Sequence, residues 1–357
     1  MSYSLNDICS HFNAVSVKGA YGNGHINDTY VCDGNPRYVL QRINSNVFKR
    51  PTEVMENIVN ITEHLKKKIA LAGGNPERES LTVIKTIDGK NVYMDEEGNF
   101  FRMYKFIENT VSYDTVDNPI QLYYAGKAFG KFQNMLDDFP ADKLYETIVD
   151  FHNTPVRVNQ LNAAIKNNAA GRLNSVKAEV DFADKYSKYA GLITDAMAEG
   201  LVPLRVTHND TKLNNILFDP KTGEGVCVVD LDTVMPGSML YDFGDAMRFG
   251  AASGAEDEKD LDKIWFDVEK FEQFTKGFVS EMRESITEKE IELLPMSVLI
   301  MTYECGTRFL ADHLNGDVYF KIHREGHNLD RARTQFKLVY DIESKLEQLS
   351  DIVKKYI

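Results

Sequence analysis

Residues 206–248 read VTHNDTKLNNILFDPKTGEGVCVVDLDTVMPGSMLYDFGDAMR, and this stretch is the most informative part of the sequence. His208 stands two residues before Asp210, and Asn215 follows Asp210 by five residues. Asp230 then ends a later apolar run. Phosphoryl transfer needs one carboxylate that accepts a hydroxyl proton and oxygen ligands that hold magnesium against the phosphates. The spacing of these side chains is typical of such a site.

Asp210 is the candidate catalytic base, and Asn215 and Asp230 are the candidate magnesium ligands. The apolar pair Ile216-Leu217 and the turn Asp219–Gly225 predict a β-hairpin that brings the two ligands together. A polar loop whose Asn and Asp serve only as turn residues is the alternative. The coincidence of four features in one stretch favours the catalytic interpretation.

The run from His208 to Asn215, followed by Val229-Asp230-Leu231-Asp232, resembles the motifs of the aminoglycoside phosphotransferase-like kinases. These kinases are relatives of the protein kinases. Tyr241-Asp242-Phe243-Gly244 is similar to the element of that family whose aspartate braces the catalytic loop. The resemblance implies that Asp242 holds the loop through buried hydrogen bonds, and we expect His208 to support the loop as well.

Three further stretches narrow the resemblance to the N-acetylhexosamine 1-kinases, the anomeric sugar kinases of gut bacteria that salvage mucin and milk-glycan sugars. The stretches are Tyr21–Asn27, Arg205–Asn215 and Glu304–Asp312. The resemblance implies ATP-dependent phosphorylation of O1 of free GlcNAc or GalNAc. It also implies that His25, Arg308 and Tyr319 contact the sugar. The preference between the two sugars stays open.

The composition disfavours several other classes of function. The 357 residues suffice for two domains, and 41 basic against 54 acidic residues give a net charge of −13, which disfavours nucleic acid and anionic membranes as partners. The N-terminus lacks signal-peptide features, and no apolar run reaches the roughly 18 residues of a membrane span. The four cysteines show no metal-binding spacing, so we expect free thiols. We expect a cytoplasmic monomer.

Short strands around one helix predict a kinase N-lobe over residues 1–107. Strands are expected over 15–19, 29–32 and 37–43, a helix over 51–70, and a meander over 81–86, 91–94 and 101–107. Residues 108–357 are expected to form a larger, mainly helical C-lobe. The predicted fold class is therefore α+β, of the two-lobe protein kinase-like type.

The nucleotide site is expected in the N-lobe. The turn that contains Gly22 and Gly24 is a candidate for the ATP phosphates, because backbone N–H groups there can face phosphate oxygens. Tyr104, Phe106 and Ile107 belong to the expected hinge, where backbone groups pair with the adenine edge. A plain hairpin and a strand end are the corresponding structural alternatives.

The third strand departs from the usual kinase pattern. Kinases of this broad class carry a Lys there that pairs with ATP phosphates, and Gln41 occupies the corresponding position. Gln41 is therefore a candidate nucleotide contact. Arg37 and Arg42 are the candidates for the missing cation.

The acceptor side of the site is expected in the C-lobe. Ser297–Leu310 predicts a core helix that carries Glu304 and Arg308 at i, i+4 spacing. An intrahelical salt bridge is the ordinary explanation, but the apolar helix favours an Arg308 that offers its guanidinium to a substrate. Asp245 either lines the sugar side with Arg248 or forms a structural ion pair with it. His152 either reaches a substrate or lies at the surface, and we expect the surface position.

Two rival functions remain. A kinase of the same fold acting on choline, homoserine, an aminoglycoside or another sugar would keep the Asp210 chemistry. A nucleotide-binding pseudokinase that regulates a partner is supported only by the missing strand-three Lys. The retention of Asp210, Asn215 and Asp230 opposes that second alternative.

Overall fold

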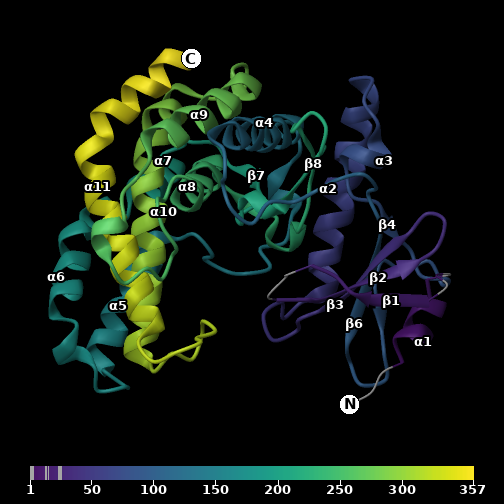
Figure 1. Cartoon of the computed structure of the whole chain (residues 1–357), viewed down its shortest axis with the longest axis horizontal. Coiled ribbons are helices and arrows are strands. Elements are labelled where there is room, and N and C mark those ends of the chain that lie inside the picture. The colour runs from purple at the N-terminus through teal and green to yellow at the C-terminus, as the bar shows by residue number, and fades with distance from the viewer. Residues whose placement is uncertain (1–3, 13, 15, 23–25) are drawn as a thin grey trace. The chain divides into compact units, whose positions relative to one another are not determined.

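The structure is a computed structural model, and it describes residues 4–12, 14, 16–22 and 26–357 (Figure 1). Gly24 and His25, two predicted site residues, lie outside these described residues. The chain divides into two compact units. The first comprises residues 1–112, 138–149 and 215–236, and the second comprises residues 113–137, 150–214 and 237–357. The predicted α+β class is confirmed, because the first unit holds an antiparallel sheet and the second is mainly helical.

The sheet of the first unit has six strands. They are β1 (Ser16–Ala20), β2 (Asp28–Asp33), β3 (Tyr38–Ile43), β4 (Val83–Ile84), β5 (Tyr93–Met94) and β6 (Phe100–Lys105). The strands β1, β2, β3 and β6 follow one another across the sheet, and β4 and β5 both pair with β6.

The predicted meander over residues 81–107 is therefore right in pairing β5 with β6 and wrong for β4, which also pairs with β6. Val83 lies opposite Tyr104, and Tyr93 lies opposite Phe101. Because β3 occupies one edge of β6, the two short strands share the other edge. Each of them is only two residues long, too short to span the partner strand.

The helices of the first unit are α1 (Leu5–Ser10), α2 (Pro51–Leu71), α3 (Pro76–Glu79), η1 (Ala141–Lys143) and η5 (Leu231–Thr233). Pro51 begins α2, where its missing N–H costs no hydrogen bond. The side chains spaced at three to four residues along α2 are buried, as the pattern predicts; they are Val54, Ile58, Ile61 and Leu65. Cys9 and Cys32 are free thiols in the core beneath the sheet, with their sulfur atoms 3.3 Å apart.

The second unit is organised around long helices. They are α4 (Pro119–Met135), α5 (Thr154–Asn167), α6 (Lys177–Tyr186), α7 (Leu192–Ala198), α8 (Met239–Gly250), α9 (Val268–Met282), α10 (Glu288–Asn315) and α11 (His327–Tyr356), with η2 (Leu173–Ser175), η3 (Ser187–Tyr189), η6 (Leu261–Lys263) and the strand β7 (Arg205–Thr207). Two short elements contain residues of both units, namely η4 (Leu213–Asn215) and β10 (Met235–Gly237). The helix α10 is buried along most of its length and packs against α5, α8 and α11.

One predicted helix of this unit is interrupted. The apolar pattern from Val180 to Met197 predicts one amphipathic helix, but the structure has α6, then η3, then α7. Gly191 precedes α7, and its flexible backbone offers no local preference for continuing the helix. Ala183, Ala190 and Ile193 are nevertheless buried, whereas Val180 and Met197 are only partly buried.

Glycines set the distance between α4 and α9. A Cβ atom added to Gly277 of α9 would lie 2.1 Å from the carbonyl oxygen of Tyr123. A Cβ atom on Gly126 of α4 would lie 2.2 Å from the carbonyl oxygen of Phe274. The two helix backbones are therefore in direct contact, with no room for a side chain between them.

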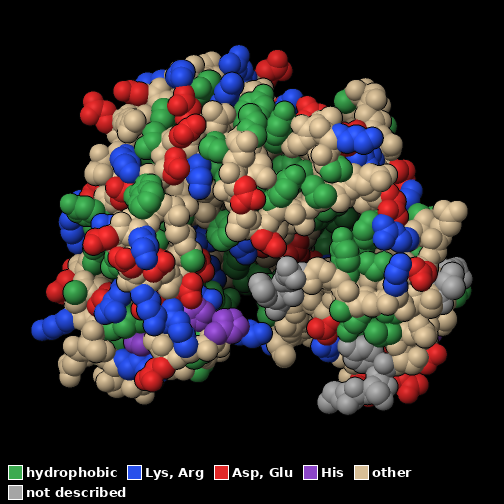
Figure 2. Space-filling model, viewed as in Figure 1, with side chains coloured by type: hydrophobic (Ala, Val, Ile, Leu, Met, Phe, Trp, Pro, Cys, Tyr) green, Lys and Arg blue, Asp and Glu red, His purple; other side chains and the backbone are tan. Residues whose placement is uncertain are grey.

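Charged side chains of both signs are interspersed over the face of the second unit that Figure 2 shows. Among the described residues, no helix combines the length and the apolar character that crossing a membrane requires.

Candidate functional site

The loop that carries Asp210 follows β7 in the second unit. His208 is fully buried, and its ring meets the rings of Phe129 and Phe132 of α4 edge to face, at centroid distances of 5.8 and 5.9 Å. The backbone N–H of Asp210 donates to His208 Nδ1 at 3.3 Å. The Asp210 side chain itself is only partly buried, which leaves its carboxylate accessible from one side.

The carboxylate of Asp242 in α8 holds this loop through hydrogen bonds. Its two carboxylate oxygens accept the backbone N–H groups of His208 at 2.8 Å and of Asn209 at 2.7 Å. The side-chain amide of Gln133 donates to the same carboxylate, and the Thr211 hydroxyl donates to the Asp242 carbonyl oxygen at 2.6 Å. Burial raises the pKa of Asp242, and these donors oppose that rise only in part.

The backbone of the loop is strained at Asn209. Its φ of 64° lies in the left-handed region, which costs a residue other than glycine about 1–3 kcal/mol at functional sites. The contacts from Asp242 hold this conformation. The residue before the candidate base is therefore fixed by its surroundings and not by its own preference.

Lys212 is a site residue that the sequence prediction missed. Its Nζ lies 2.7 Å from the Asp210 carboxylate. Partial burial opposes the charged ammonium, but the Asp210 carboxylate outweighs it, so the pKa of Lys212 is raised. The sequence signal for this contact was a lysine two residues after the candidate base. The ammonium group of this lysine lies beside the Asp210 carboxylate.

His152 is buried, so its predicted surface position is wrong. Only 8% of the residue is exposed. Nδ1 lies 2.9 Å from Glu304 Oε1, and Nε2 lies 3.2 Å from the carbonyl oxygen of Asn209. The second Glu304 oxygen accepts the Thr154 hydroxyl at 2.7 Å. The prediction failed because Glu304 and Asn209, the partners of His152, lie far from it in the sequence.

Glu304 stays ionised in this arrangement. Burial opposes its charge, but the positive field of His152, the hydrogen bond to it, and Arg308 together hold the pKa of Glu304 below its usual value. Glu304 thus pairs with His152 and not with Arg308. The intrahelical salt bridge considered for the sequence is absent from the described part of the chain.

Arg308 lies between two aromatic rings. Its guanidinium carbon is 5.4 Å from the ring centre of Phe151 and 5.6 Å from that of Phe320. Within the described residues the guanidinium has no hydrogen-bond or ion-pair partner, although the residue is half-buried. Its donors are therefore available to a ligand.

A single carboxylate holds the loop beside Arg308. Asp312, one turn further along α10, accepts the backbone N–H groups of Val318, Tyr319 and Phe320 at 2.9–3.0 Å. The Asn328 side chain donates to the same carboxylate at 2.9 Å. The Tyr319 side chain is 67% exposed, so it is free to contact a ligand.

Asp245 and Arg248, whose role the sequence leaves open, form a buried ion pair. The Arg248 guanidinium lies 3.0 Å from the Asp245 carboxylate and 2.9 Å from Glu256. Burial alone would raise the pKa of Asp245, but Arg248, His152 and Lys212 reverse this and lower it. The structural ion pair is thus present in the structure.

The two candidate magnesium ligands belong to the first unit. The predicted hairpin is confirmed, since β8 (Ile216–Phe218) pairs antiparallel with β9 (Gly225–Val228), and Ile216 lies opposite Val228. The Val229 N–H donates to the Asn215 carbonyl at 2.9 Å. Asn215 and Asp230 therefore lie at the same end of the hairpin.

The donor set at this end suits magnesium. Asp230 is exposed and has a left-handed φ of 59°, while Asn215 is buried. Among the described residues there is no cluster of three or more His, Cys, Asp or Glu side chains that could hold a metal. One carboxylate and one amide oxygen are what Mg²⁺ uses when substrate phosphates and water complete its shell. The residues present therefore fit this ion.

Arg102 of β6 is the buried cation of the first unit, and the sequence prediction missed it. It is 1% exposed and pairs with Asp232, while its Nε donates to the Gln41 side-chain oxygen at 3.0 Å. Asn27 donates to the other Asp232 oxygen at 2.6 Å. Burial opposes the charge of Arg102, but Asp232 outweighs it and the pKa of Arg102 is raised.

The predicted replacement cations have surface partners instead. Arg37 pairs with Glu108, and Arg42 pairs with Asp28, all four side chains being about half-exposed. Gln41 lies directly opposite Arg102 in the β3–β6 register. An arginine in an otherwise apolar strand was the available signal for a buried charge.

The remaining nucleotide candidates lie around the end of β6. Tyr104 and Ile107 are buried, and the Phe106 ring lies 4.1 Å from the guanidinium carbon of Arg37. Phe106 also donates its N–H to the Arg37 carbonyl at 2.9 Å. Gly22 has a φ of 74°, which glycine adopts without strain, and open space surrounds it.

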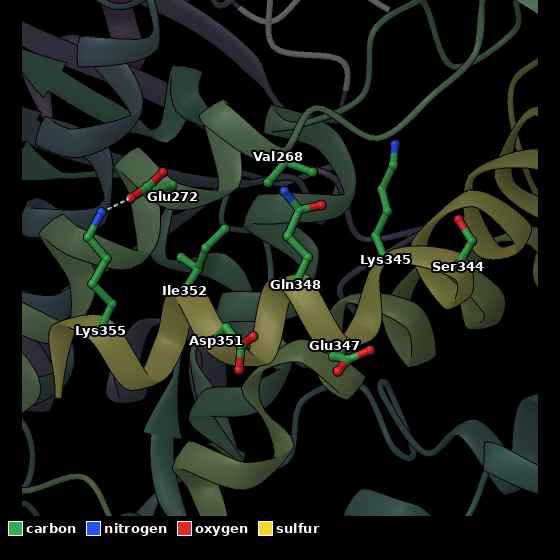
Figure 3. Close-up of a pocket in the computed structure, with 9 residues that line it drawn as sticks. All are labelled: Val268, Glu272, Ser344, Lys345, Glu347, Gln348, Asp351, Ile352 and Lys355. Carbon is green, nitrogen blue, oxygen red and sulfur yellow. Dashed lines mark hydrogen bonds and ion pairs between the residues drawn. The ribbon is translucent and has the colours of Figure 1, made fainter.

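A shallow groove of about 560 Å³ between α9 and α11 is separate from these residues. Figure 3 shows its lining side chains, including the ion pair between Lys355 and Glu272. The groove contains none of the predicted site residues.

Comparisons with known proteins identify a family and several similar folds. A model of the phosphotransferase enzyme family matches residues 20–274. Similar solved structures include a microcompartment-associated aminopropanol kinase (16% identity, TM-score 0.63, 97% of each chain covered) and a spectinomycin phosphotransferase in complex with ADP and spectinomycin (13% identity, TM-score 0.59, 96% of this chain and 97% of that chain). Plasmodium vivax ethanolamine kinase is also similar (15% identity, TM-score 0.53, 88% of this chain and 80% of that chain).

At these identities the solved structures show the fold alone, and that fold is the kinase-like one that the sequence predicts. The family model, in contrast, spans well over half of the chain. The protein therefore belongs to the phosphotransferase enzyme family.

Proposed function

We propose that the protein is an ATP-dependent kinase that phosphorylates O1 of free GlcNAc or GalNAc and gives the sugar 1-phosphate and ADP. The observation that carries the proposal is the environment of Arg308. Its half-buried guanidinium lies between Phe151 and Phe320 and keeps its donors free of partners within the described chain. Such a group suits an uncharged acceptor rich in oxygen atoms.

A chain of contacts connects Arg308 with the catalytic loop. Phe151, which covers one face of the guanidinium, is followed in sequence by His152, which reaches the carbonyl of Asn209. Asn209 directly precedes Asp210. An acceptor held by Arg308 is therefore expected to present a hydroxyl group to Asp210.

The positive charge around Arg308 argues against a cationic acceptor. Arg157 of α5 lies near enough that burial and, after it, the charge of Arg308 lower the pKa of Arg157. Two guanidinium groups in one region repel choline, ethanolamine or a polycationic aminoglycoside. The hydroxyl groups and acetamide oxygen of an N-acetyl sugar accept hydrogen bonds from them instead.

In the proposed mechanism Asp210 orients the anomeric hydroxyl and accepts its proton, which contributes about 10²–10⁴-fold to the rate. Lys212 holds the Asp210 carboxylate and adds positive charge beside the phosphoryl group in transfer. Asn215 and Asp230 would hold Mg²⁺, which offsets phosphate charge when bound. Asp242 and His208 keep the loop in place.

The nucleotide is proposed to contact the first unit. Gly22 and Gly24 would face the phosphates, Gln41 would lie near them, and the backbone around Phe106 would face the adenine. The same proposal assigns His25, Tyr319 and Asp245 to the sugar side. The ion pair of Asp245 with Arg248 makes its contribution one of positioning.

The test is coupled ADP release with ATP and Mg²⁺ against GlcNAc, GalNAc, glucose, galactose, choline, homoserine, ethanolamine and kanamycin. The product is then examined for acid-labile anomeric phosphate. We expect the two N-acetyl sugars to be turned over well above the others and Asp210→Asn to abolish turnover.

Arg308→Ala should raise KM for the sugar more than tenfold, because a charge-assisted hydrogen bond contributes about 1.5–3 kcal/mol. Arg333→Ala is the matched control, since that arginine pairs with Glu179 instead. Turnover confined to a cationic acceptor would refute the sugar assignment and keep the Asp210 chemistry. No ADP release with any acceptor would favour a regulatory protein.

A further inference from the structure

The buried pair of His152 and Glu304 links Arg308 to the catalytic loop but has no step of its own in the proposed mechanism. It joins three separate segments of the second unit, namely the start of α5, the middle of α10 and the catalytic loop. Removing a charged pair from water costs free energy, so a buried pair of this kind calls for a structural explanation. Its contacts lead directly to the residue before Asp210.

Both partners of the imidazole are acceptors. The Glu304 carboxylate faces Nδ1, and the Asn209 carbonyl oxygen faces Nε2. A carbonyl oxygen has no proton to donate, and Glu304 already accepts the Thr154 hydroxyl on its other oxygen. The ring satisfies both partners only when it carries a proton on each nitrogen.

We propose that His152 is a doubly protonated positioning residue that, together with Glu304, holds the Asn209 carbonyl and so sets the position of Asp210. The proposal rests on the proposed role of Asp210 as the base. Asn209 requires such contacts because its φ of 64° is left-handed, and a strained peptide persists only where its surroundings fix it. Asp242 fixes the N–H side of this segment, and His152 fixes the carbonyl side.

The charges around the pair are compatible with an imidazolium. Asp245 on α8 lies close enough for His152 to lower its pKa. Arg308 on α10 and Arg157 on α5 also interact electrostatically with Glu304. Glu304 and Asp245 thus both present a negative charge to His152.

The protonation state is tested first, by nitrogen NMR of protein labelled at its 8 histidines, with the His152 signals assigned from His152→Gln. We expect both ring nitrogens of His152 to be protonated at pH 7. A neutral ring with one protonated nitrogen would overturn the proposal.

The positioning role is tested with His152→Gln and Glu304→Gln. We expect either change to lower kcat about tenfold to a hundredfold while KM for ATP stays within about twofold, because the loop shifts relative to the acceptor. Amide exchange over residues 208–212 should become faster in both variants. His327→Gln is the matched control, since His327 is equally buried and pairs with Asp257 elsewhere in the unit.

The two proposals fail in different ways. If no acceptor is phosphorylated by the wild type, the proposed function fails, and NMR and amide exchange still decide the role of His152. If the wild type is active and His152→Gln behaves like His327→Gln in both kcat and exchange, the positioning role is wrong.

Discussion

Replacing Gly277 with Ala tests whether the backbone contact between α4 and α9 controls the site. The added Cβ would lie 2.1 Å from the Tyr123 carbonyl oxygen and 2.8 Å from the Lys127 nitrogen. Since ordinary contacts are about 3.5 Å, the helices must separate locally by more than about 1 Å. Overpacking of this kind costs up to about 3 kcal/mol, and the better helix propensity of Ala returns about 1 kcal/mol.

We therefore expect Gly277→Ala to lower the free energy of unfolding by about 2 kcal/mol, measured by urea denaturation followed by circular dichroism. We also expect kcat to fall about tenfold, because α4 carries the side chains that contact the catalytic loop. Phe129 and Phe132 contact the His208 ring of that loop, and Gln133 donates to Asp242, which holds the loop. Glu269→Ala, at an exposed position of α9, is the control and should change either quantity little.

A variant as stable as the wild type would refute the close-contact argument. Lost stability with unchanged kcat would instead show that the loop does not depend on the position of α4. The two measurements thus separate the packing claim from the claim about the site.

Two further predictions concern charges of the second unit. Lys212→Met should lower kcat about 10²-fold with little change in KM for the acceptor, because it removes the cation held against Asp210. Lys221→Met, in an exposed turn, is the control. An equal effect of both changes would contradict the role of Lys212. The lowered pKa of Asp245 means that its ionised form stabilises the fold above its ordinary pKa of 3.8 and that this contribution is lost as the pH falls below that value. Asp245→Asn should therefore cost about 3 kcal/mol of unfolding free energy at pH 7 and flatten the loss of stability on acidification below pH 3.8, measured by urea denaturation at a series of pH values. An unchanged acid slope would show that the carboxylate is not stabilised in the fold.

The sequence predicts those parts of the molecule that depend on short-range pattern. The hairpin with Asn215 and Asp230 at its end follows from an apolar pair, a turn and an apolar strand in succession, and it is present. The buried helix around Ser297–Leu310 follows in the same way, although α10 extends beyond both predicted ends. Local pattern therefore suffices where neighbours in the chain are also neighbours in space.

The sequence does not predict partners that only the tertiary structure brings together. His152 and Glu304 are separated by 152 positions, and Arg102 and Asp232 by 130. An apolar neighbourhood indicates the burial of Arg102 and Glu304, but nothing near either residue in the sequence identifies its partner, since a charged residue is ordinarily exposed. The same limitation explains why Arg37 and Arg42, and not the buried Arg102, were the candidates for the missing cation.

The fastening of the loop after α10 has a consequence for changing the specificity of this protein. Asp312 holds residues 318–320 only through their backbone N–H groups. Any side chain apart from proline leaves these three bonds intact, so the path of the loop does not depend on its own sequence. Val318 and Tyr319 point largely into solvent and are therefore exchangeable, whereas Asp312 is not. If the loop contacts the acceptor as proposed, libraries built at positions 318 and 319 would vary those contacts without disturbing the helix that carries Arg308.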